Sequence, residues 1–406
     1  MSAQFLSALA DNAILVIAIA LLDAMTAPPW MTPFLKFFFI ASFVAFAFVV
    51  GALADAFPKP RVMFLGNTIK AAGCGLMLLG AHPLLAYALI GFGAAAYSPA
   101  KYGLLTELLP ASQLVSANAW LEGLTIASVI LGTFLGGVLV SPEFAGLVGV
   151  SMPRSPMALA AALVCALGLY LGAAIVNLLI PDSGRRYTSA SPRALQLAQA
   201  FQQALRTLLD DAAGRASLLV TTLLWGVGAT LQFVVIDWSR ERLQLPLDRA
   251  AMLPGVVAIG VAIGAACAAR WVTLERSLSI LPLGLLLGPL VIAVLPFQSL
   301  PIVCLLLFVN GIAAGYFIVP MNALLQHRGH LLVNAGQAIA VQNFCENLSV
   351  MAMLSAYAAM RGFGVPLMLI IVTLGIFTSA AMAAIQSHRR RSTDRRTPGP
   401  ATGAEP

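Results

Sequence analysis

Long apolar segments separated by short polar ones make up nearly all of this chain. Uncharged or nearly uncharged runs of about 20 residues recur along it, and each is long enough to cross a bilayer as an α-helix. By this length criterion we count about twelve runs. They begin near Ala3, Phe34, Val62, Leu84, Ala117, Met157, Ser217, Ala251, Leu278, Pro301, Gly336 and Val365. The pattern predicts an all-α polytopic membrane protein with twelve transmembrane helices and little chain left for a soluble domain.

The composition supports this prediction and excludes several classes of protein. Of the 406 residues, 60% are hydrophobic and 10% are charged, whereas a soluble domain has about 25% charged residues. The sequence contains no Walker A motif, which excludes an ATP-driven motor in this chain, and no HExxH or GxSxG motif of a hydrolase. The five cysteines stand singly, without the spacing of a metal site. We therefore expect no enzyme activity, no cofactor and no metal.

Basic residues are distributed unequally between the two sides of the predicted spans. An even number of spans places both termini on one side. The loops and the tail on that side hold fifteen Lys and Arg residues, and the loops on the other side hold six. Since cytoplasmic loops carry the excess of Lys and Arg, both termini are predicted to be cytoplasmic. The same distribution explains the net charge of +7, so we expect no nucleic-acid partner.

The longest polar stretch divides the chain into two halves. We predict an N-terminal six-helix bundle over residues 1–180, a cytoplasmic linker over 181–215 and a C-terminal six-helix bundle over 216–387. Residues 388–406 are predicted to form a disordered basic cytoplasmic tail. Within the linker, the segment RALQLAQAFQQALRTLLDD has apolar residues near helical spacing. It is predicted to form an amphipathic helix on the cytoplasmic membrane surface.

The second half resembles the first, which indicates an internal duplication. SANAWLEGL, in the fifth predicted span, aligns with AVQNFCENL in the eleventh at an offset of 224 residues. Pro99 aligns with Pro320 at an offset of 221 residues. The same offset pairs two further sets of polar residues, Lys101 with Asn322 and Asp11 with Gln232. A six-plus-six duplication is typical of transporters built from parallel repeats, whose substrate site lies between the halves.

The loop after the second predicted span carries a recognisable signature. Its sequence, GALADAFPKPR, resembles the loop signature of the major facilitator superfamily at Gly51, Asp55, Lys59 and Arg61, and departs from it at the two prolines. GTFLGG in the fifth span resembles the glycine-rich stretch of the same superfamily. The resemblance implies the major facilitator fold, with two six-helix pseudo-repeats. It also implies that Asp55 acts as a conformational latch to a facing helix end.

Ionisable residues inside the predicted spans are functional candidates, because each costs about 2.5–3.5 kcal/mol on membrane-insertion scales. In the superfamily that this chain resembles, the first, fourth, seventh and tenth spans line a central cavity. By that resemblance, four polar residues are expected to face one space: Asp11, Lys101, Gln232 and Asn322. Glu122 in the fifth span and Glu346 in the eleventh complete the set of candidate substrate-binding residues.

Structural interpretations of the same residues stay open. Lys101 lies near the cytoplasmic end of its span, where its ammonium either extends to the interface or forms a structural ion pair with Glu122. Neighbouring asparagines, Asn343 among them, are close enough to hold Glu346 in a structural network. Lys70, near the cytoplasmic side of the third span, is interpreted as a lysine whose ammonium reaches the interface.

Four blocks of sequence resemble the bacterial lysophospholipid transporter family. They are AQFLSALADNA, GAAAYSPAKYG, VPMNALLQHRG and AGQAIAVQNFCEN, and the resemblance extends over nearly the whole chain. It implies movement of lysophosphatidylethanolamine and related lyso-glycerophospholipids from the outer to the inner leaflet of the bacterial inner membrane. It also implies a separate cytosolic partner, an acyltransferase/acyl-carrier-protein synthetase that restores the missing acyl chain.

On this resemblance, two charged residues are assigned to the lipid headgroup. Lys101 is expected to attract the phosphate and Asp11 to pair with the ethanolamine ammonium, since such contacts are stronger in a low-dielectric cavity than in water. Gln232 departs from the arginine that is usual at this place in the family, which weakens the case for an anion site in the C-terminal half.

Two other functions stay open. One is proton-coupled export of drugs or small metabolites, with Asp11, Glu122 and Glu346 as proton carriers. The other is a membrane scaffold for the acyltransferase that transports nothing.

Overall fold

The structure of the protein is a computed structural model. It describes residues 1–28, 31–150, 152, 155–184, 194–245, 247–250 and 252–394, and the regular structure in these residues is helical. Part of the predicted linker, residues 185–193, and the end of the predicted tail, residues 395–406, lie outside the described residues.

The first part of the chain forms eight α-helices and one short 3₁₀ helix. They are α1 (Ser2–Ala24), α2 (Met31–Ala45), α3 (Ala47–Ala56), α4 (Lys59–Leu78), α5 (Pro83–Leu108), η1 (Ala111–Gln113), α6 (Leu114–Leu139), α7 (Pro142–Leu147) and α8 (Pro156–Leu178). Helix starts follow local chemistry. Ser141 and Ser155 accept hydrogen bonds from backbone N–H groups in the first turns of α7 and α8, and each is followed by a proline, which has no N–H to leave unsatisfied.

The second part of the chain begins with the linker helix. Its elements are α9 (Ala194–Asp210), α10 (Ala212–Arg242), α11 (Leu247–Ala250), α12 (Leu253–Trp271), η2 (Leu274–Leu286), α13 (Leu287–Ile292), α14 (Leu300–Leu332), α15 (Ala335–Gly362) and α16 (Leu367–Asp394). Asp211 separates α9 from α10 and caps α10, since its carboxylate accepts from the Gly214 N–H at 2.8 Å. α16 continues to Asp394, so residues 388–394 of the predicted disordered tail are helical.

Nine helical segments within the described residues are long and apolar enough to cross a membrane. The α2–α3 pair, whose two parts meet at 61°, makes a tenth. α4 and α15 are also long enough, at 20 and 28 residues, and carry several buried polar side chains. With these two, the helices match the twelve apolar runs predicted from the sequence.

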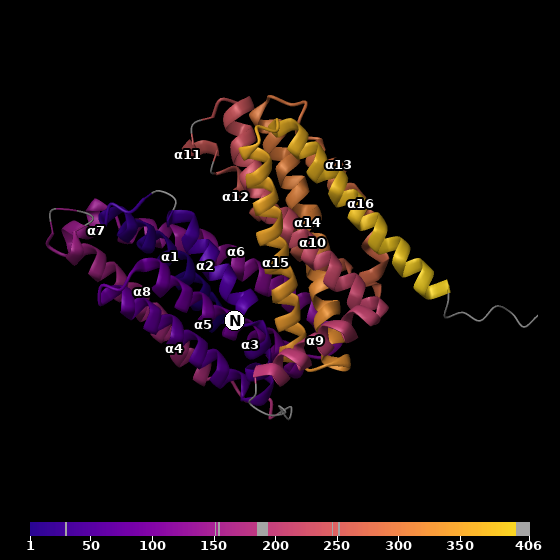
Figure 1. Cartoon of the computed structure of the whole chain (residues 1–406), viewed down its shortest axis with the longest axis horizontal. Helices are drawn as coiled ribbons and strands as arrows, with labels where there is room; N and C mark the ends of the chain where they lie inside the picture. Colours follow the sequence, from indigo (N-terminus) through magenta and orange to yellow (C-terminus); the bar gives the residue numbers. More distant parts are fainter. Residues whose placement is uncertain are drawn as a thin grey trace, which may run out of the picture.

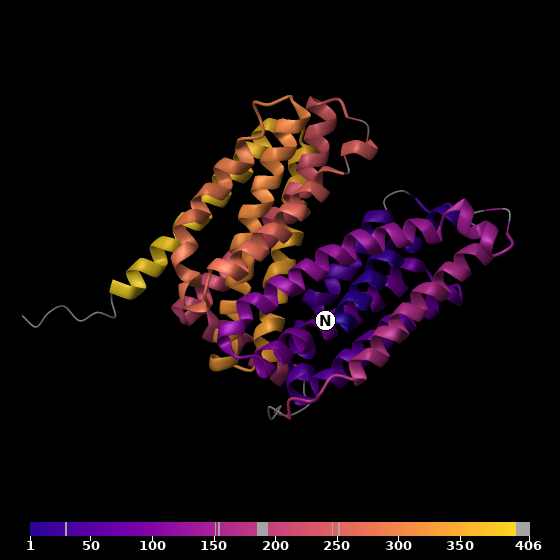
Figure 2. The same cartoon turned by 180° about the vertical axis from the view of Figure 1, so that it is seen from behind.

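The helices form two groups that meet at one end and separate toward the other. α1–α8 make one group and α10–α16 make the other (Figures 1 and 2). The groups approach each other where α3 and α9 lie, which we call the α9 end, and diverge toward the end that carries α7 and α11. Each group has its own buried apolar core. Two helix groups are what the duplication predicts; the exact residue limits of the two bundles stay a prediction.

α9 packs against helices of both groups. Ala204 and Leu208 on its apolar face are 2% and 0% exposed and pack with residues of the C-terminal group, such as Leu325. Phe201 packs edge-on against Phe344 of α15, with the ring centroids 5.5 Å apart. The sequence prediction of an amphipathic helix is confirmed. The buried face of the helix rests on protein, and its placement at the cytoplasmic membrane surface stays a prediction.

Candidate functional site

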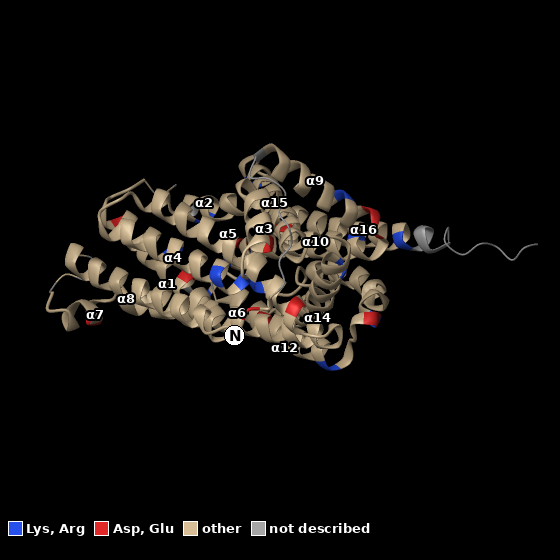
Figure 3. Ribbon diagram, turned by 90° about the horizontal axis from the view of Figure 1, so that it is seen from below, with Lys and Arg blue, Asp and Glu red and all other residues tan. Residues whose placement is uncertain are grey.

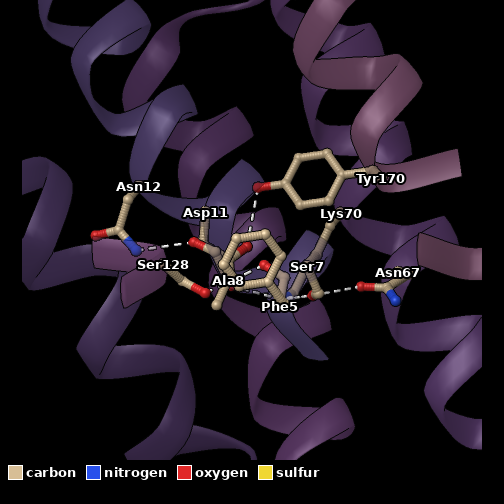
Figure 4. A network of polar contacts seen from close by, with 9 residues as sticks. All are labelled: Phe5, Ser7, Ala8, Asp11, Asn12, Asn67, Lys70, Ser128 and Tyr170. Carbon is tan, nitrogen blue, oxygen red and sulfur yellow. Dashed lines mark hydrogen bonds and ion pairs between the residues drawn. The ribbon is translucent and has the colours of Figure 1, made fainter. Parts of the chain in front are cut away.

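A buried ion pair lies inside the N-terminal group of helices (Figure 4). Lys70 on α4 is 2% exposed, and its Nζ donates to Asp11 Oδ2 on α1 at 2.7 Å. The same ammonium donates to Ser7 Oγ at 3.0 Å, and the Ser7 hydroxyl donates to Asn67 Oδ1 at 2.7 Å. Tyr170 on α8 donates from its hydroxyl to the other Asp11 oxygen at 2.9 Å. Donors on two other helices, α4 and α8, therefore hold the Asp11 carboxylate in one position.

This network changes the roles expected for two residues. The interpretation of Lys70 as an interfacial lysine is wrong, because its ammonium is buried against a carboxylate within the protein. Asp11 has a donor on each oxygen, and an ammonium ligand would have to compete with Lys70 for it. Removing either partner of such a pair leaves an uncompensated buried charge.

Lys101 on α5 has an aromatic partner and no close carboxylate. Its Nζ lies 4.1 Å from the centroid of the Tyr102 ring, in the range of a cation–π contact. Within the described part of the chain, no carboxylate oxygen comes within 4.0 Å of this ammonium, so the structural ion pair with Glu122 is not formed. Glu122 and Asp11 are still near enough to act on Lys101 electrostatically. Lys101 as a whole is half-buried.

A second polar network lies in the C-terminal group of helices. Gln342 on α15 donates from Nε2 to Asn322 Oδ1 on α14 at 2.8 Å and to Glu346 Oε1 at 2.7 Å. All three residues are buried. The structure thus joins two predicted site residues, Asn322 and Glu346, through a third residue on the same face of α15.

Gln232 lies apart from these networks. It is exposed on α10, on a face that also carries Trp225 and Phe233, which are 40% and 43% exposed. Among the described residues, Gln232 shares no hydrogen bond with any other predicted site residue. The expectation that Asp11, Lys101, Gln232 and Asn322 face one space stays a prediction.

Seen from below, charged residues lie both where the two helix groups meet and along the C-terminal group toward α16, with long uncharged stretches of helix between them (Figure 3). One of them connects the groups directly. Asp55, at the end of α3, accepts from the backbone N–H groups of Gly336 and Gln337 at 2.7 and 3.0 Å. These groups belong to the first turn of α15, where unsatisfied N–H groups and the helix dipole favour a negative charge. Asp55 therefore lies at a facing helix end, where the loop signature placed it.

The other residues of the loop signature have separate structural roles. Gly51 permits the close approach of α3 and α15, since a Cβ there would lie 2.8 Å from Ala340 Cβ. Lys59 is 1% exposed and pairs with Glu107 of α5 at 2.5 Å, within the N-terminal group. The Ser183 hydroxyl donates to the same carboxylate. Arg61 is exposed at the start of α4.

Two side-chain contacts also cross between the helix groups. Asn118 on α6 and Gln326 on α14 form a reciprocal amide pair, with N···O distances of 2.9 and 2.8 Å. Asn343 on α15 donates to Ser98 Oγ on α5 at 2.9 Å. These contacts, like that of Asp55, join helices of opposite groups near the α9 end.

Several of these residues were not predicted as site residues. Lys70 and Asn67 are three residues apart, so they share one face of α4, and this spacing was an available signal. Tyr170 and Gln326 have no such signal, because their partners are distant in sequence.

Comparison with known proteins identifies the family. The model described as Major Facilitator Superfamily matches residues 1–353. A lysophospholipid transporter LplT of Klebsiella pneumoniae is 40% identical over 390 residues, which cover 96% of this chain and 94% of that protein. A protein of the same name from Yersinia pestis is 42% identical over 366 residues, covering 90% and 86%. The chain belongs to the lysophospholipid transporter family of the major facilitator superfamily.

Solved structures agree with the fold of this lysophospholipid transporter family member. The fucose transporter FucP in its outward conformation has a TM-score of 0.72 at 14% identity, over 96% of this chain and 97% of that one. A bacterial homologue of the iron transporter ferroportin has a TM-score of 0.68 at 16% identity, over 95% and 98%. The predicted major facilitator fold and the predicted family are confirmed.

Proposed function

We propose that the protein carries lysophospholipids, lysophosphatidylethanolamine among them, from the outer to the inner leaflet of a bacterial inner membrane. Relatives that are 40–42% identical over most of the chain bear the name lysophospholipid transporter. The structural observation that carries the proposal is the state of Lys101. It is a half-buried lysine without a carboxylate at ion-pair distance among the described residues. A lipid phosphate is an anion that would complete this site.

The phosphate headgroup and the acyl chain of a lysophospholipid require different surroundings, and the protein provides both. The phosphate gains a charge-assisted hydrogen bond to Lys101 in a region shielded from water, where such a contact is stronger than at a surface. The acyl chain needs only apolar surroundings, and the exposed face of α10 with Trp225 and Phe233 supplies large apolar side chains. The headgroup thus binds near the α9 end while the chain stays toward the diverging end of the helix groups.

The proposed direction follows from the charges and the shape. The α9 end, with both termini, is assigned to the cytoplasm by the excess of basic residues. The helix groups then diverge toward the outside, and the contacts of Asp55, Asn118 and Asn343 close the cytoplasmic end. Release of the lipid inward requires these contacts to break, as in alternating access. A separate cytosolic acyltransferase/acyl-carrier-protein synthetase then reacylates it.

The test uses purified protein in proteoliposomes and labelled lysophosphatidylethanolamine. Lys101→Gln keeps most of the side-chain volume and removes the charge. We expect it to reduce lipid movement at least about tenfold, the loss of one charged hydrogen bond. Lys36→Gln, an exposed lysine of α2, is the matched control and should transport normally. A well-folded wild type that moves no lysophospholipid would overturn the proposal, and so would a fully active Lys101→Gln variant.

A further inference from the structure

A small cavity lies inside the C-terminal group of helices, toward the diverging end. Trp238, one turn before the end of α10, and Asn310 on α14 line this cavity. The other described lining residues are leucine, isoleucine or valine, and they come from α10, α14, α16 and the region of α13. The cavity therefore lies in the apolar core of the C-terminal group, apart from the polar networks of the candidate functional site.

Two hydrogen-bond donors in the wall of this cavity are buried and have no acceptor. Trp238 and Asn310 are 3% and 5% exposed. Within the described part of the chain, neither Trp238 Nε1 nor Asn310 Nδ2 has a hydrogen-bond partner. The polar neighbours of Trp238 are engaged elsewhere, since Asp237 accepts from Tyr357 of α15 and Ser239 donates to a carbonyl of its own helix. A buried donor without an acceptor is costly, so both groups require an acceptor from the cavity.

The internal duplication indicates that these donors are not needed for packing. At the offset of 221 residues found between the halves, Ile17 corresponds to Trp238 and Leu89 to Asn310. Ile17 is 0% exposed in the core of the N-terminal group. Apolar side chains thus occupy the corresponding positions in the first half. The two donors of the second half are a departure from the repeat, which points to a ligand that accepts hydrogen bonds.

A water molecule suits this cavity in size and in chemistry. A buried water needs room for one molecule and roughly two to four polar partners, whereas a cavity lined only by apolar groups stays dry. The cavity has room for about one water molecule. The oxygen of a water molecule has two lone pairs, so it can accept from Trp238 Nε1 and Asn310 Nδ2 together. Its hydrogens can donate to backbone carbonyls, which have a second lone pair within a helix.

We propose that one ordered water molecule binds in this cavity and bridges the Trp238 indole to the Asn310 amide. The bridge links α10 to α14 inside the apolar core and gives both buried donors an acceptor. The site takes no part in the proposed binding of lipid, so the two proposals stand or fall separately.

The indole proton of Trp238 reports this water in the wild type. Three other tryptophans, Trp120, Trp225 and Trp271, are 70%, 40% and 66% exposed, so their indole protons should exchange faster with solvent. We expect the slowly exchanging indole signal in detergent micelles to show a rotating-frame Overhauser contact with a water proton in NMR spectra. Loss of this signal in Trp238→Phe assigns it. A Trp238 indole proton without a water contact would overturn the proposal.

Asn310→Leu tests the bridge, because it keeps the approximate shape of the side chain and introduces the residue type of the first half. The cavity then has one donor in an apolar wall, and we expect the water to leave. Ultraviolet resonance Raman spectra contain an indole band that responds to N–H hydrogen bonding, and subtraction of the matching Trp238→Phe spectrum isolates the band of Trp238. The band should shift to that of an unbonded indole. Asn177→Leu, the same change at a buried asparagine of α8, should leave it unchanged, and an indole that stays bonded in Asn310→Leu would overturn the bridge.

The melting temperature provides a second test through the sign of its change. If water joins the two donors, Asn310→Leu leaves the Trp238 N–H without an acceptor, and the melting temperature should fall. If no acceptor occupies the cavity, the same variant removes an unsatisfied buried amide, and the melting temperature should rise. A rise relative to the wild type would therefore overturn the proposal.

Discussion

At the scale of single residues, the Asp11–Lys70 pair shows what buried charges require. The Lys70 ammonium has Asp11 and Ser7 as acceptors, and the rings of Tyr97 and Tyr170 lie 5.3 and 5.9 Å from it. Such a pair adds little stability compared with apolar residues of the same size, yet it is strongly destabilising to remove one member alone. The pair therefore links α1 to α4 through their side chains.

This reasoning predicts the effect of breaking the pair. Lys70→Met leaves the Asp11 carboxylate with only the Tyr170 hydroxyl, and should lower the free energy of unfolding by about 3 kcal/mol. The double variant Lys70→Met/Asp11→Leu removes both charges and should recover most of that loss. Unfolding in detergent micelles, followed by circular dichroism, measures the free energy of unfolding of the single and the double variant. A double variant that is no more stable than Lys70→Met would contradict the prediction.

The residue scale is also where prediction from sequence was weakest. Asp11 was singled out because it lies deep in an apolar run, and its burial in a polar network agrees with that. Lys70 was misplaced because nearness to a span end says nothing of which helix lies opposite. Its partner is 59 residues away, and the packing of both α1 and α4 against α8 brings the two together. Tyr170 was missed for the same reason.

At the scale of helices, the sequence was more informative. Apolar runs of spanning length predicted the helices, because backbone groups in a bilayer must be satisfied within a segment. The amphipathic pattern of α9 predicted a helix with one buried face. It did not predict what covers that face, since an apolar stripe fits lipid and protein equally. Phe201 contacts Phe344 of α15, which is far away in sequence, and this contact shows that protein covers part of that face.

Close packing of α12 on α14 gives a prediction at this scale. A Cβ at Gly264 would overlap the carbonyl oxygen of Ile312, whereas one at Gly255, on the same helix, would meet nothing within 4 Å. Gly264→Ala should therefore force the helices apart and cost about 1–3 kcal/mol. Gly255→Ala should change stability by less than about 0.5 kcal/mol. Melting temperatures in one detergent compare the two, and equal values would show that α12 and α14 do not pack as closely as described.

At the scale of the whole molecule, the two helix groups are connected at one end and separate at the other. Near the α9 end, Asp55, Asn118 and Asn343 connect the helix groups, and α9 packs against helices of both groups. Toward α7 and α11 the groups diverge (Figure 1). The duplication predicted two similar bundles, and their individual architecture followed from it. The relative tilt of the bundles could not be predicted in this way, because it depends on contacts between residues distant in sequence that the repeat does not encode.

Apolar clusters and a small set of polar contacts join the helix groups at the α9 end, and removing the charge from one polar contact should change the balance between conformations. Asp55→Asn keeps the side-chain shape but removes the charge that faces the first turn of α15, and hydrogen bonds to charged groups contribute about 1.5–3 kcal/mol. The variant should therefore populate a state in which the α9 end opens and the diverging ends approach each other.

Spin labels at Glu143 of α7 and Arg240 of α10, both exposed at the diverging ends, measure the distance between these ends by double electron–electron resonance. We expect a new population at shorter distance in Asp55→Asn. Asp210→Asn, an exposed carboxylate of α9, serves as the control, and identical distance distributions in the two variants would show that Asp55 does not hold the end closed.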